Sequence, residues 1–248
     1  MAQALDRPDV EFGKSPKHFA ITCDGHRRFA VEHGLSLSEG YELGVKLLFN
    51  MIPWIFIDHG VEVFSVNFMP YSITVDTSPR AQRRAQAVWE PILSYFSSDK
   101  VSIFHKYSIR FMILGEKTAL PLDILGILED LENSTMDYSP RKFYLALGYS
   151  HIREVLSASK NFSGEMTDTL EFSRNLWVQE PVDLFYRPGG VHVRGDFLLL
   201  QSIHARIFFD DKLFPEITKE DIDNIFKGYI EHNDEHARTS QITRSYFS

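Results

Sequence analysis

The sequence predicts a single α/β domain with a central, mainly parallel sheet flanked by helices. Short apolar runs alternate along the chain with longer amphipathic stretches, and this rhythm is typical of βαβ units. No linker rich in proline, glycine or serine divides the 248 residues, and 44% of them are hydrophobic, enough to bury one large core. We expect a flexible polar arm over residues 1–16 and the domain over residues 17–248.

The predicted elements follow the apolar pattern. Compact apolar runs predict five strands: Phe19–Cys23, Val61–Phe68, Ile109–Leu114, Phe143–Leu147 and Val182–Tyr186. Amphipathic stretches predict five helices: Glu39–Ile57, Ala81–Phe96, Leu122–Leu131, Phe197–Phe208 and Lys219–His232. We expect Ser38 to cap the first helix, and Pro53 and Pro91 to bend the helices that contain them.

Composition excludes several classes of protein. The net charge of -8 argues against general nucleic-acid binding, because that binding needs a basic face. No apolar run reaches the roughly 20 residues needed to cross a bilayer, so we expect no stable membrane insertion. The single cysteine, Cys23, excludes an internal disulfide framework, and the first residues do not resemble a secretion signal. We therefore expect the protein in the cytoplasm. The chain carries neither a glycine-rich nucleotide loop nor cysteine and histidine pairs at zinc spacing.

A first polar cluster follows the first predicted strand. Asp24-Gly25-His26-Arg27-Arg28 stands where that strand ends, and ligands of open α/β sheets bind at the carboxyl ends of strands. Asp24 can hold a divalent cation, and Gly25 lets the backbone approach a ligand closely. Arg27 or Arg28 can donate two parallel hydrogen bonds to phosphate oxygens. The cluster indicates a diphosphate and metal site; the alternative is a tight Asp-Gly turn beside solvated arginines.

A second polar cluster follows the last predicted strand. It contains Arg187, Gly189, Gly190, His192 and Arg194. A guanidinium, two glycines and a further guanidinium are what a second anion pocket needs. The alternative is a Pro-Gly-Gly turn with a solvated arginine beside it.

Together the two clusters resemble the motifs of the cis-prenyltransferase family, the isoprenyl diphosphate synthases typified by undecaprenyl diphosphate synthase. The family's first motif, Asp-Gly-Asn-x-Arg-Trp, stands here as Asp24-Gly25-His26-Arg27-Arg28-Phe29. Its late motif, Arg-Thr-x-Gly, is matched by Arg187-Pro188-Gly189-Gly190. Three stretches, Phe197–Gln201, Ile207–Phe209 and Leu213–Pro215, follow the family's Phe-Leu-Leu-Trp-Gln, Leu-Tyr-Phe and Leu-Trp-Pro in the same order. The likeness spans about residues 17 to 235.

The resemblance implies a fold, a cofactor and a set of roles. The family has a six-stranded parallel sheet, forms homodimers, uses Mg²⁺ and keeps its apolar product in a tunnel between sheet and helices. By motif, Asp24 would serve the Mg²⁺-dependent departure of diphosphate. Arg28 would bind the allylic diphosphate, and Arg187 the diphosphate of the second substrate. Such a tunnel is one use for the 20 phenylalanines and 10 tyrosines; a thick aromatic core is the other.

The departures from the family pattern indicate a divergent branch. Leu37 and Tyr41 stand where the family has arginine and histidine, Val191 replaces the late glutamate, and Arg206 replaces a carboxylate that helps to bind metal. The pattern resembles the bacterial branch of lavandulyl-type, irregular isoprenyl diphosphate synthases. We therefore expect an enzyme that condenses an allylic diphosphate, such as dimethylallyl or geranyl diphosphate, with a second prenyl diphosphate in a head-to-middle bond. Regular cis elongation with isopentenyl diphosphate, a non-catalytic subunit and a terpene cyclase are the alternatives.

Several side chains beside the motifs carry two interpretations each. His26 is a candidate proton acceptor, since an ordinary histidine pKa near 6.5 allows that role, or else a helix-terminal residue without chemistry. Tyr41 and His192 are candidate phosphate contacts, or else turn and surface residues. Arg194 is a candidate for the second diphosphate, and Arg206 would add diphosphate binding if it faces the site.

Overall fold

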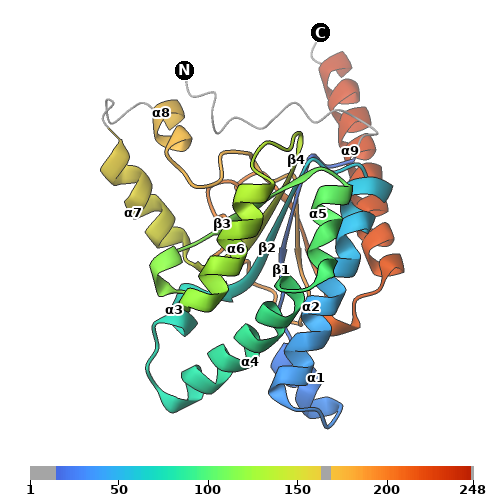
Figure 1. The fold of residues 1–248 in the computed structure, drawn as a ribbon. Coiled ribbons are helices and arrows are strands. Elements are labelled where there is room, and N and C mark those ends of the chain that lie inside the picture. The colour runs from blue at the N-terminus through green and yellow to red at the C-terminus, as the bar shows by residue number, and fades with distance from the viewer. Residues whose placement is uncertain (1–14, 163–168, 247–248) are drawn as a thin grey trace.

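The centre of the protein is a six-stranded, all-parallel sheet. The computed structural model describes residues 15–162 and 169–246 (Figure 1). Its strand order is β3-β4-β2-β1-β5-β6. The strands are β1 (His18–Thr22), β2 (Val63–Pro70), β3 (Ile109–Leu114), β4 (Arg141–Tyr149), β5 (Leu184–Arg187) and β6 (Arg206–Phe209). The α/β class and all five predicted strands are confirmed. The predicted arm falls, up to residue 14, outside the described residues.

Helices cover both faces of this sheet (Figure 1). They are α1 (His26–Glu32), α2 (Leu37–Pro53), α3 (Tyr71–Thr74), α4 (Pro79–Phe96), α5 (Ser102–Lys106), α6 (Leu122–Ser134), α7 (His151–Asn161), α8 (Thr169–Arg174) and α9 (Lys219–Tyr246). The five predicted helices did not include α1, α3, α5, α7 and α8. Within the described ranges, no helix combines the length and apolar character needed to cross a membrane. The cytoplasmic location stays a prediction.

The start of α2 corrects the predicted cap. Ser36, not Ser38, is the N-cap: Glu39 N donates to Ser36 Oγ over 3.2 Å, and Ser36 N donates to the Glu39 carboxylate over 2.7 Å. Such a capping box requires the acid three residues after the cap, and only Ser36 has this spacing. At its other end α2 stops at Pro53 and continues as one π-helical turn (Trp54–Asp58), which is the irregularity predicted there.

The helix predicted over Phe197–Phe208 is wrong. Phe197 and Leu198 are fully buried in a series of turns against the sheet, and Leu198 has a φ of 46°. The chain then forms β6, which pairs with the edge of β5. The apolar run is therefore a loop that packs on the sheet, and the aromatic residues after it favour a strand because they pair along that edge.

Phenylalanine rings fill the layer between the sheet and the helices α2, α4 and α5. Phe49 lies 5.2 Å from Phe96, and Phe104 lies 5.3 Å from Phe111 and 5.5 Å from Phe143, all measured between ring centroids. Phe104, Phe111 and Phe143 are fully buried. Aromatic rings at these spacings are in contact, so these residues form a close-packed part of the core.

We expect Phe104→Ala to lower the free energy of unfolding by about 3–5 kcal/mol, because it leaves a cavity among rings that cannot close over it. Urea denaturation of the purified protein measures this change. The control Leu122→Ala, at a side chain that is 85% exposed, should change the free energy by less than about 0.5 kcal/mol. A loss at Phe104 as small as the control's would show that this layer is loosely packed.

Candidate active site

An ion pair joins the ends of β1 and β5. Arg187, the last residue of β5, donates from Nη2 to Asp24 Oδ2 over 3.1 Å. Arg28, on α1, donates from its own Nη2 to Asp24 Oδ1 over 3.5 Å. The structure thus brings the two predicted clusters together, with one guanidinium at each carboxylate oxygen. The Asp24 side chain remains 33% exposed, whereas that of Arg187 is 11% exposed.

Glycines keep the backbone close to this ion pair. Gly189 has a φ of 100°, and a Cβ there would lie 3.0 Å from Asp24 Cβ. A Cβ on Gly195 would lie 2.5 Å from Arg187 Nη1. The N–H groups of Gly189 and Gly190 already donate to backbone oxygens, over 2.7 and 2.8 Å. Gly189 and Gly190 therefore leave space beside the arginines. Direct binding of substrate by Gly189 and Gly190 stays a prediction.

His26 forms an aromatic wall beside Asp24. Its ring is 3% exposed and stacks on Tyr41 at 4.7 Å, with the ring of Phe68 at 5.2 Å. Burial lowers the pKa of His26 to about 3, although the nearby Asp24 carboxylate opposes this shift. Nε2 has no hydrogen-bond partner among the described residues and faces Gly44, where a Cβ would lie 2.1 Å away. The ring is neutral at physiological pH, and its proton-accepting role stays a prediction.

A cavity of about 410 Å³ opens over these groups. Its polar part is formed by Asp24, Arg27 and Arg28, and its inner part by His26, Tyr41 and Phe68. One side of it is Arg84, on α4, whose Nε donates to the Tyr41 hydroxyl over 3.1 Å. Sequence reasoning missed Arg84, because an arginine on an amphipathic helix is usually a solvated residue.

Three of the other candidates lie apart from the carboxylate. His192 is exposed and pairs through Nε2 with Asp211 over 3.2 Å. Arg194 donates from Nη1 to the Ser202 carbonyl over 3.0 Å, and burial lowers its pKa. Arg206 is the first residue of β6, at the opposite end of that strand from the one that neighbours Arg187. Within one chain, Arg206 therefore does not face Asp24, so the condition under which it would add diphosphate binding is not met there.

The donor set fits one Mg²⁺ ion that a substrate completes. No cluster of three or more histidine, cysteine, aspartate or glutamate residues suitable for a metal occurs in the described part of the chain. Mg²⁺ needs only one or two carboxylates, because phosphate oxygens and water fill the rest of its shell. The Asp24 side chain is 33% exposed and lines the cavity, so it is the residue that would hold the ion.

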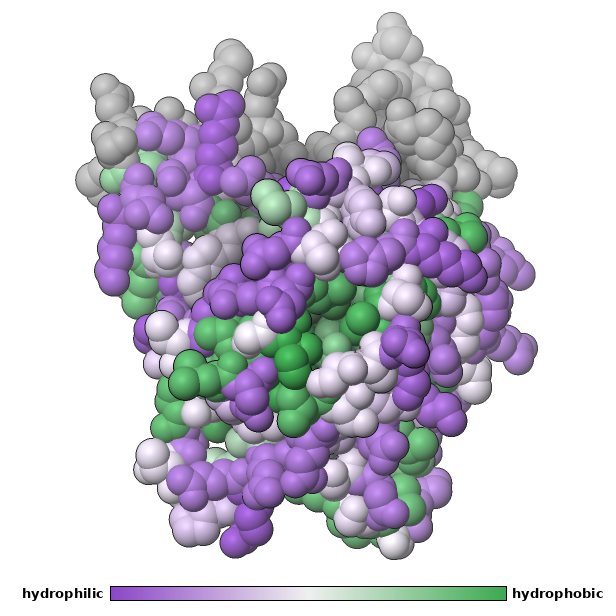
Figure 2. Space-filling view, viewed as in Figure 1, coloured by the Kyte–Doolittle hydropathy of each residue, from purple (hydrophilic) through white to green (hydrophobic). Residues whose placement is uncertain are grey.

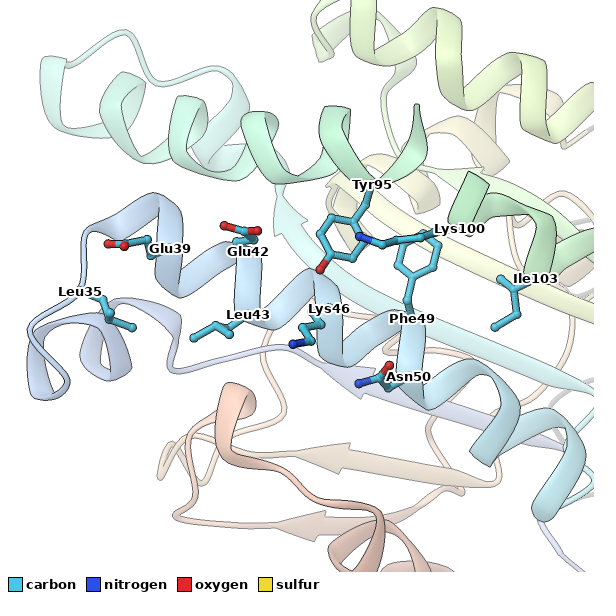
Figure 3. A pocket seen from close by; sticks show the side chains of 10 residues that line it. All are labelled: Leu35, Glu39, Glu42, Leu43, Lys46, Phe49, Asn50, Tyr95, Lys100 and Ile103. Carbon is cyan, nitrogen blue, oxygen red and sulfur yellow. The ribbon is translucent and has the colours of Figure 1, made fainter. Parts of the chain in front are cut away.

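A larger cavity, of about 700 Å³, lies on the outer side of α2 (Figure 3). Leu43, Lys46 and Asn50 line it from the face of α2 that points away from buried Tyr41, and Tyr95 and Lys100 close it from above. The carboxylates of Glu39 and Glu42 are balanced by Lys46 and Lys100, and no arginine lies around it. The Asp24 cavity has three arginines against the carboxylates of Asp24 and Glu32, which suits an anion better, so it is the candidate active site.

Comparisons with known proteins identify relatives of this chain. A family model described as "Putative undecaprenyl diphosphate synthase" matches residues 22–237. The chain is 27% identical to a tritrans,polycis-undecaprenyl-diphosphate synthase (geranylgeranyl-diphosphate specific) of Pyrobaculum aerophilum, over 87% of this chain and 93% of that one. It is also 27% identical to an isoprenyl transferase of Rickettsia bellii, over 86% of this chain and 94% of the other.

Two solved structures share the fold. Lavandulyl diphosphate synthase from Lavandula x intermedia, in complex with dimethylallyl diphosphate, superimposes with a TM-score of 0.79 at 20% identity, covering 87% of this chain and 95% of that one. A probable undecaprenyl diphosphate synthase from Campylobacter jejuni gives a TM-score of 0.69 at 20% identity, with the same coverage. At this identity the likeness shows the fold alone, and it confirms the predicted architecture.

Stability should fall with acidification because of His26. Its pKa is about 3 in the folded chain and about 6.5 in an unfolded one, so the unfolded state binds the proton first. The contribution of His26 to the free energy of unfolding is complete above about pH 6.5 and is lost as the pH falls towards about 3. His18, whose pKa burial lowers to about 4, acts in the same direction.

We expect His26→Asn to reduce the slope of the free energy of unfolding against pH between about 6.5 and about 4. Urea denaturation across this range measures the slope. The matched control His192→Asn removes an exposed imidazole and should leave the slope as it is. An equal slope in wild type and His26→Asn would mean that the ring is accessible to protons in the folded protein.

Proposed function

This chain belongs to the undecaprenyl diphosphate synthase family of prenyltransferases, and we propose that it joins two short isoprenyl diphosphates in an irregular, head-to-middle condensation. The family model covers most of the chain, so prenyl transfer is its activity. The allylic substrate in this proposal is dimethylallyl or geranyl diphosphate. The product is a branched, lavandulyl-type diphosphate.

The short apolar end of the Asp24 cavity is the observation that carries this proposal. At about 410 Å³, the cavity lies near the lower end of the roughly 300–1,000 Å³ typical of small-molecule sites. The rings of Tyr41, His26 and Phe68 close its inner end. Beyond them the layer between sheet and helices is packed with phenylalanine. A cavity of this size suits a chain of one or two isoprene units.

The polar end suits the departure of a diphosphate. Arg28 and Arg187 lie on either side of Asp24, so their guanidiniums can neutralise phosphate charge on both sides of the carboxylate. When bound at Asp24, Mg²⁺ would stabilise the charge that develops on the leaving group. The aromatic walls exclude water, which would otherwise capture the allylic cation.

The proposed reaction conserves atoms and electrons. The bond from C1 of the allylic substrate to the diphosphate oxygen breaks, and the diphosphate leaves with the electron pair. The π electrons of the second substrate form the new bond to C1. A proton then leaves the neighbouring carbon and restores the double bond. The leaving diphosphate and His26 are the two candidate acceptors of that proton, and His26 serves only if Nε2 turns away from Gly44.

Regular cis elongation is the second candidate. It is supported by the names of the relatives in Pyrobaculum aerophilum and Rickettsia bellii, which are an undecaprenyl-diphosphate synthase and an isoprenyl transferase. Elongation uses isopentenyl diphosphate as the second substrate, whereas the proposed reaction proceeds with dimethylallyl diphosphate alone. The two reactions therefore differ in what they require.

Product analysis tests the proposal. The purified protein with Mg²⁺ and dimethylallyl diphosphate alone should give a branched C10 product, identified by mass spectrometry after removal of phosphate. A linear product that forms only when isopentenyl diphosphate is added would replace the proposal with elongation. No turnover with any pair of substrates would favour a non-catalytic subunit.

We expect Asp24→Asn to lower kcat on the order of 100-fold or more, because the variant loses the carboxylate that would hold the metal and orient both guanidiniums. Steady-state kinetics with dimethylallyl diphosphate measures the loss. The control Asp130→Asn removes an exposed carboxylate on α6 and should leave kcat within about twofold. Full activity in Asp24→Asn would remove the basis for the metal site.

A homodimer is the proposed assembly, and the β6 edge of the sheet is the surface that supports it. Among the described residues β6 is the last strand of the sheet and pairs with β5, so it is an edge strand. Phe209, the last residue of β6, is an exposed apolar residue on this edge strand. A two-fold dimer is the commonest closed assembly of identical chains.

We expect Phe209→Asp to convert the dimer into a monomer, because the new carboxylate would be buried without a partner. Light scattering after size-exclusion chromatography gives the mass. The control Leu122→Asp introduces the same charge on α6 and should leave the dimer intact. A monomeric wild type would exclude the proposed assembly.

A further inference from the structure

A fully buried carboxylate on α7 has no part in the reaction described above. It belongs to Glu154, which is 0% exposed and accepts from the Tyr149 hydroxyl. Glu154 also accepts from Gln201 Nε2 over 2.9 Å and from Val178 N over 3.2 Å. Burial of a carboxylate is costly unless donors surround it, and these three donors meet that requirement. The carboxylate therefore joins the end of β4 to two separate loops.

This network holds the segment formed by residues 195–202, which connects the glycine-rich loop to β6. Leu198 N donates to the Tyr149 hydroxyl over 3.3 Å. His151 N, at the start of α7, donates to Asp196 Oδ1 over 3.0 Å. The start of α7 and the last residue of β4 therefore fix segment 195–202 at the end of the sheet.

The backbone of segment 195–202 is strained at Leu198. Its φ of 46° lies in the left-handed region, which a branched side chain rarely adopts. Such a conformation persists only where the surroundings enforce it. Here the Leu198 side chain is fully buried and its N–H is bound by the Tyr149 hydroxyl. The shape of the segment therefore depends on that hydroxyl.

Segment 195–202 lies directly against Arg187. A Cβ on Gly195 would lie 2.5 Å from Arg187 Nη1, while Asp24 accepts from Nη2 over 3.1 Å. The guanidinium is therefore confined between Gly195 and the Asp24 carboxylate. Its buried Nε has no hydrogen-bond partner among the described residues. A buried donor without a partner is unfavourable, and a bound anion would satisfy it.

We propose that Glu154 and Tyr149 are positioning residues for the diphosphate of the second prenyl substrate. They fix segment 195–202, and the segment holds Arg187 in place for that diphosphate. In Figure 2, hydrophilic side chains cover most of the end of the molecule towards which the strands point, whereas Glu154 and Tyr149 are buried. The inference rests on the proposed function, because it concerns a substrate of that reaction. Neither positioning residue contacts the substrate.

Calorimetric titration with isopentenyl diphosphate tests the positioning role. This probe cannot ionise as an allylic diphosphate does, so the full-length protein with Mg²⁺ binds it without turnover. The test variant Tyr149→Phe removes one hydroxyl and keeps the ring. The matched control Thr135→Val removes an equally buried hydroxyl, which accepts from Phe111 N over 3.0 Å beside β3.

We expect the dissociation constant to rise by about tenfold in Tyr149→Phe and by less than about twofold in Thr135→Val. The thermal midpoint should fall in both variants, since each loses a buried hydrogen bond. Glu154→Gln should act in the same direction as Tyr149→Phe, because its amide offers an N–H group to a site built from donors. Wild-type affinity in Tyr149→Phe would overturn the inference.

A second pair of variants leaves the buried network intact. Gly195→Ala places a methyl group against Arg187 at a position that is exposed, so the fold should persist. The control Gly34→Ala puts the same group on a backbone of similar φ, 65° against 75°, with no atom within 4 Å. We expect about a tenfold rise in the dissociation constant for Gly195→Ala and less than about twofold for Gly34→Ala. Equal affinities in these two variants would contradict the role of the segment.

A double-mutant cycle separates positioning from general support of the fold. If Tyr149 acts through Arg187, Tyr149→Phe should change the affinity by less than about twofold in a protein that already carries Arg187→Lys. Additive losses would overturn the positioning role and leave the proposed function intact. A wild type that binds neither isopentenyl diphosphate nor the thiolo analogue of dimethylallyl diphosphate, which does not ionise readily, would overturn the proposed function itself.

Discussion

The site depends on the ion pair between Asp24 and Arg187. It exists only because β1 and β5 are parallel neighbours, which brings together two residues that are 163 positions apart in the chain. A largely buried guanidinium needs a compensating charge, and Asp24 provides it from the next strand end. The glycines at 189 and 195 leave the space that the pair occupies. Strand order, glycine loop and carboxylate therefore act as one unit that holds Arg187 ready for an anion.

Asp24 also orients the two arginines that pair with it. Because its two oxygens each accept from a different guanidinium, it orients Arg28 and Arg187 before any ligand arrives. Groups that are already oriented need less rearrangement when charge develops on a leaving group. The aromatic wall of His26, Tyr41 and Phe68 complements this polar end by limiting the length of the chain that can enter. The charged groups bind the diphosphate of the substrate, and the aromatic side chains contact its prenyl chain.

The parts of the fold that could be predicted are those whose pattern is local. Each of two apolar runs predicts a strand, and the charged residue at its end, Asp24 or Arg187, predicts the location of the site. β6 could not be predicted in this way, since its four residues follow a longer apolar run that equally suits a helix. Arg84 was not predicted as a site residue, for a different reason. Its role depends on the packing of α4 against α2, and no spacing within the sequence reveals which arginine of that helix reaches Tyr41.

The direct test of the account is a crystal structure of the protein with Mg²⁺ and the thiolo analogue of dimethylallyl diphosphate. We predict that the diphosphate of the analogue lies beside Asp24 and Arg28, with the prenyl chain against Tyr41 and Phe68. A diphosphate bound in the groove on the outer side of α2, or a prenyl chain that passes between Phe49 and Phe96, would contradict it.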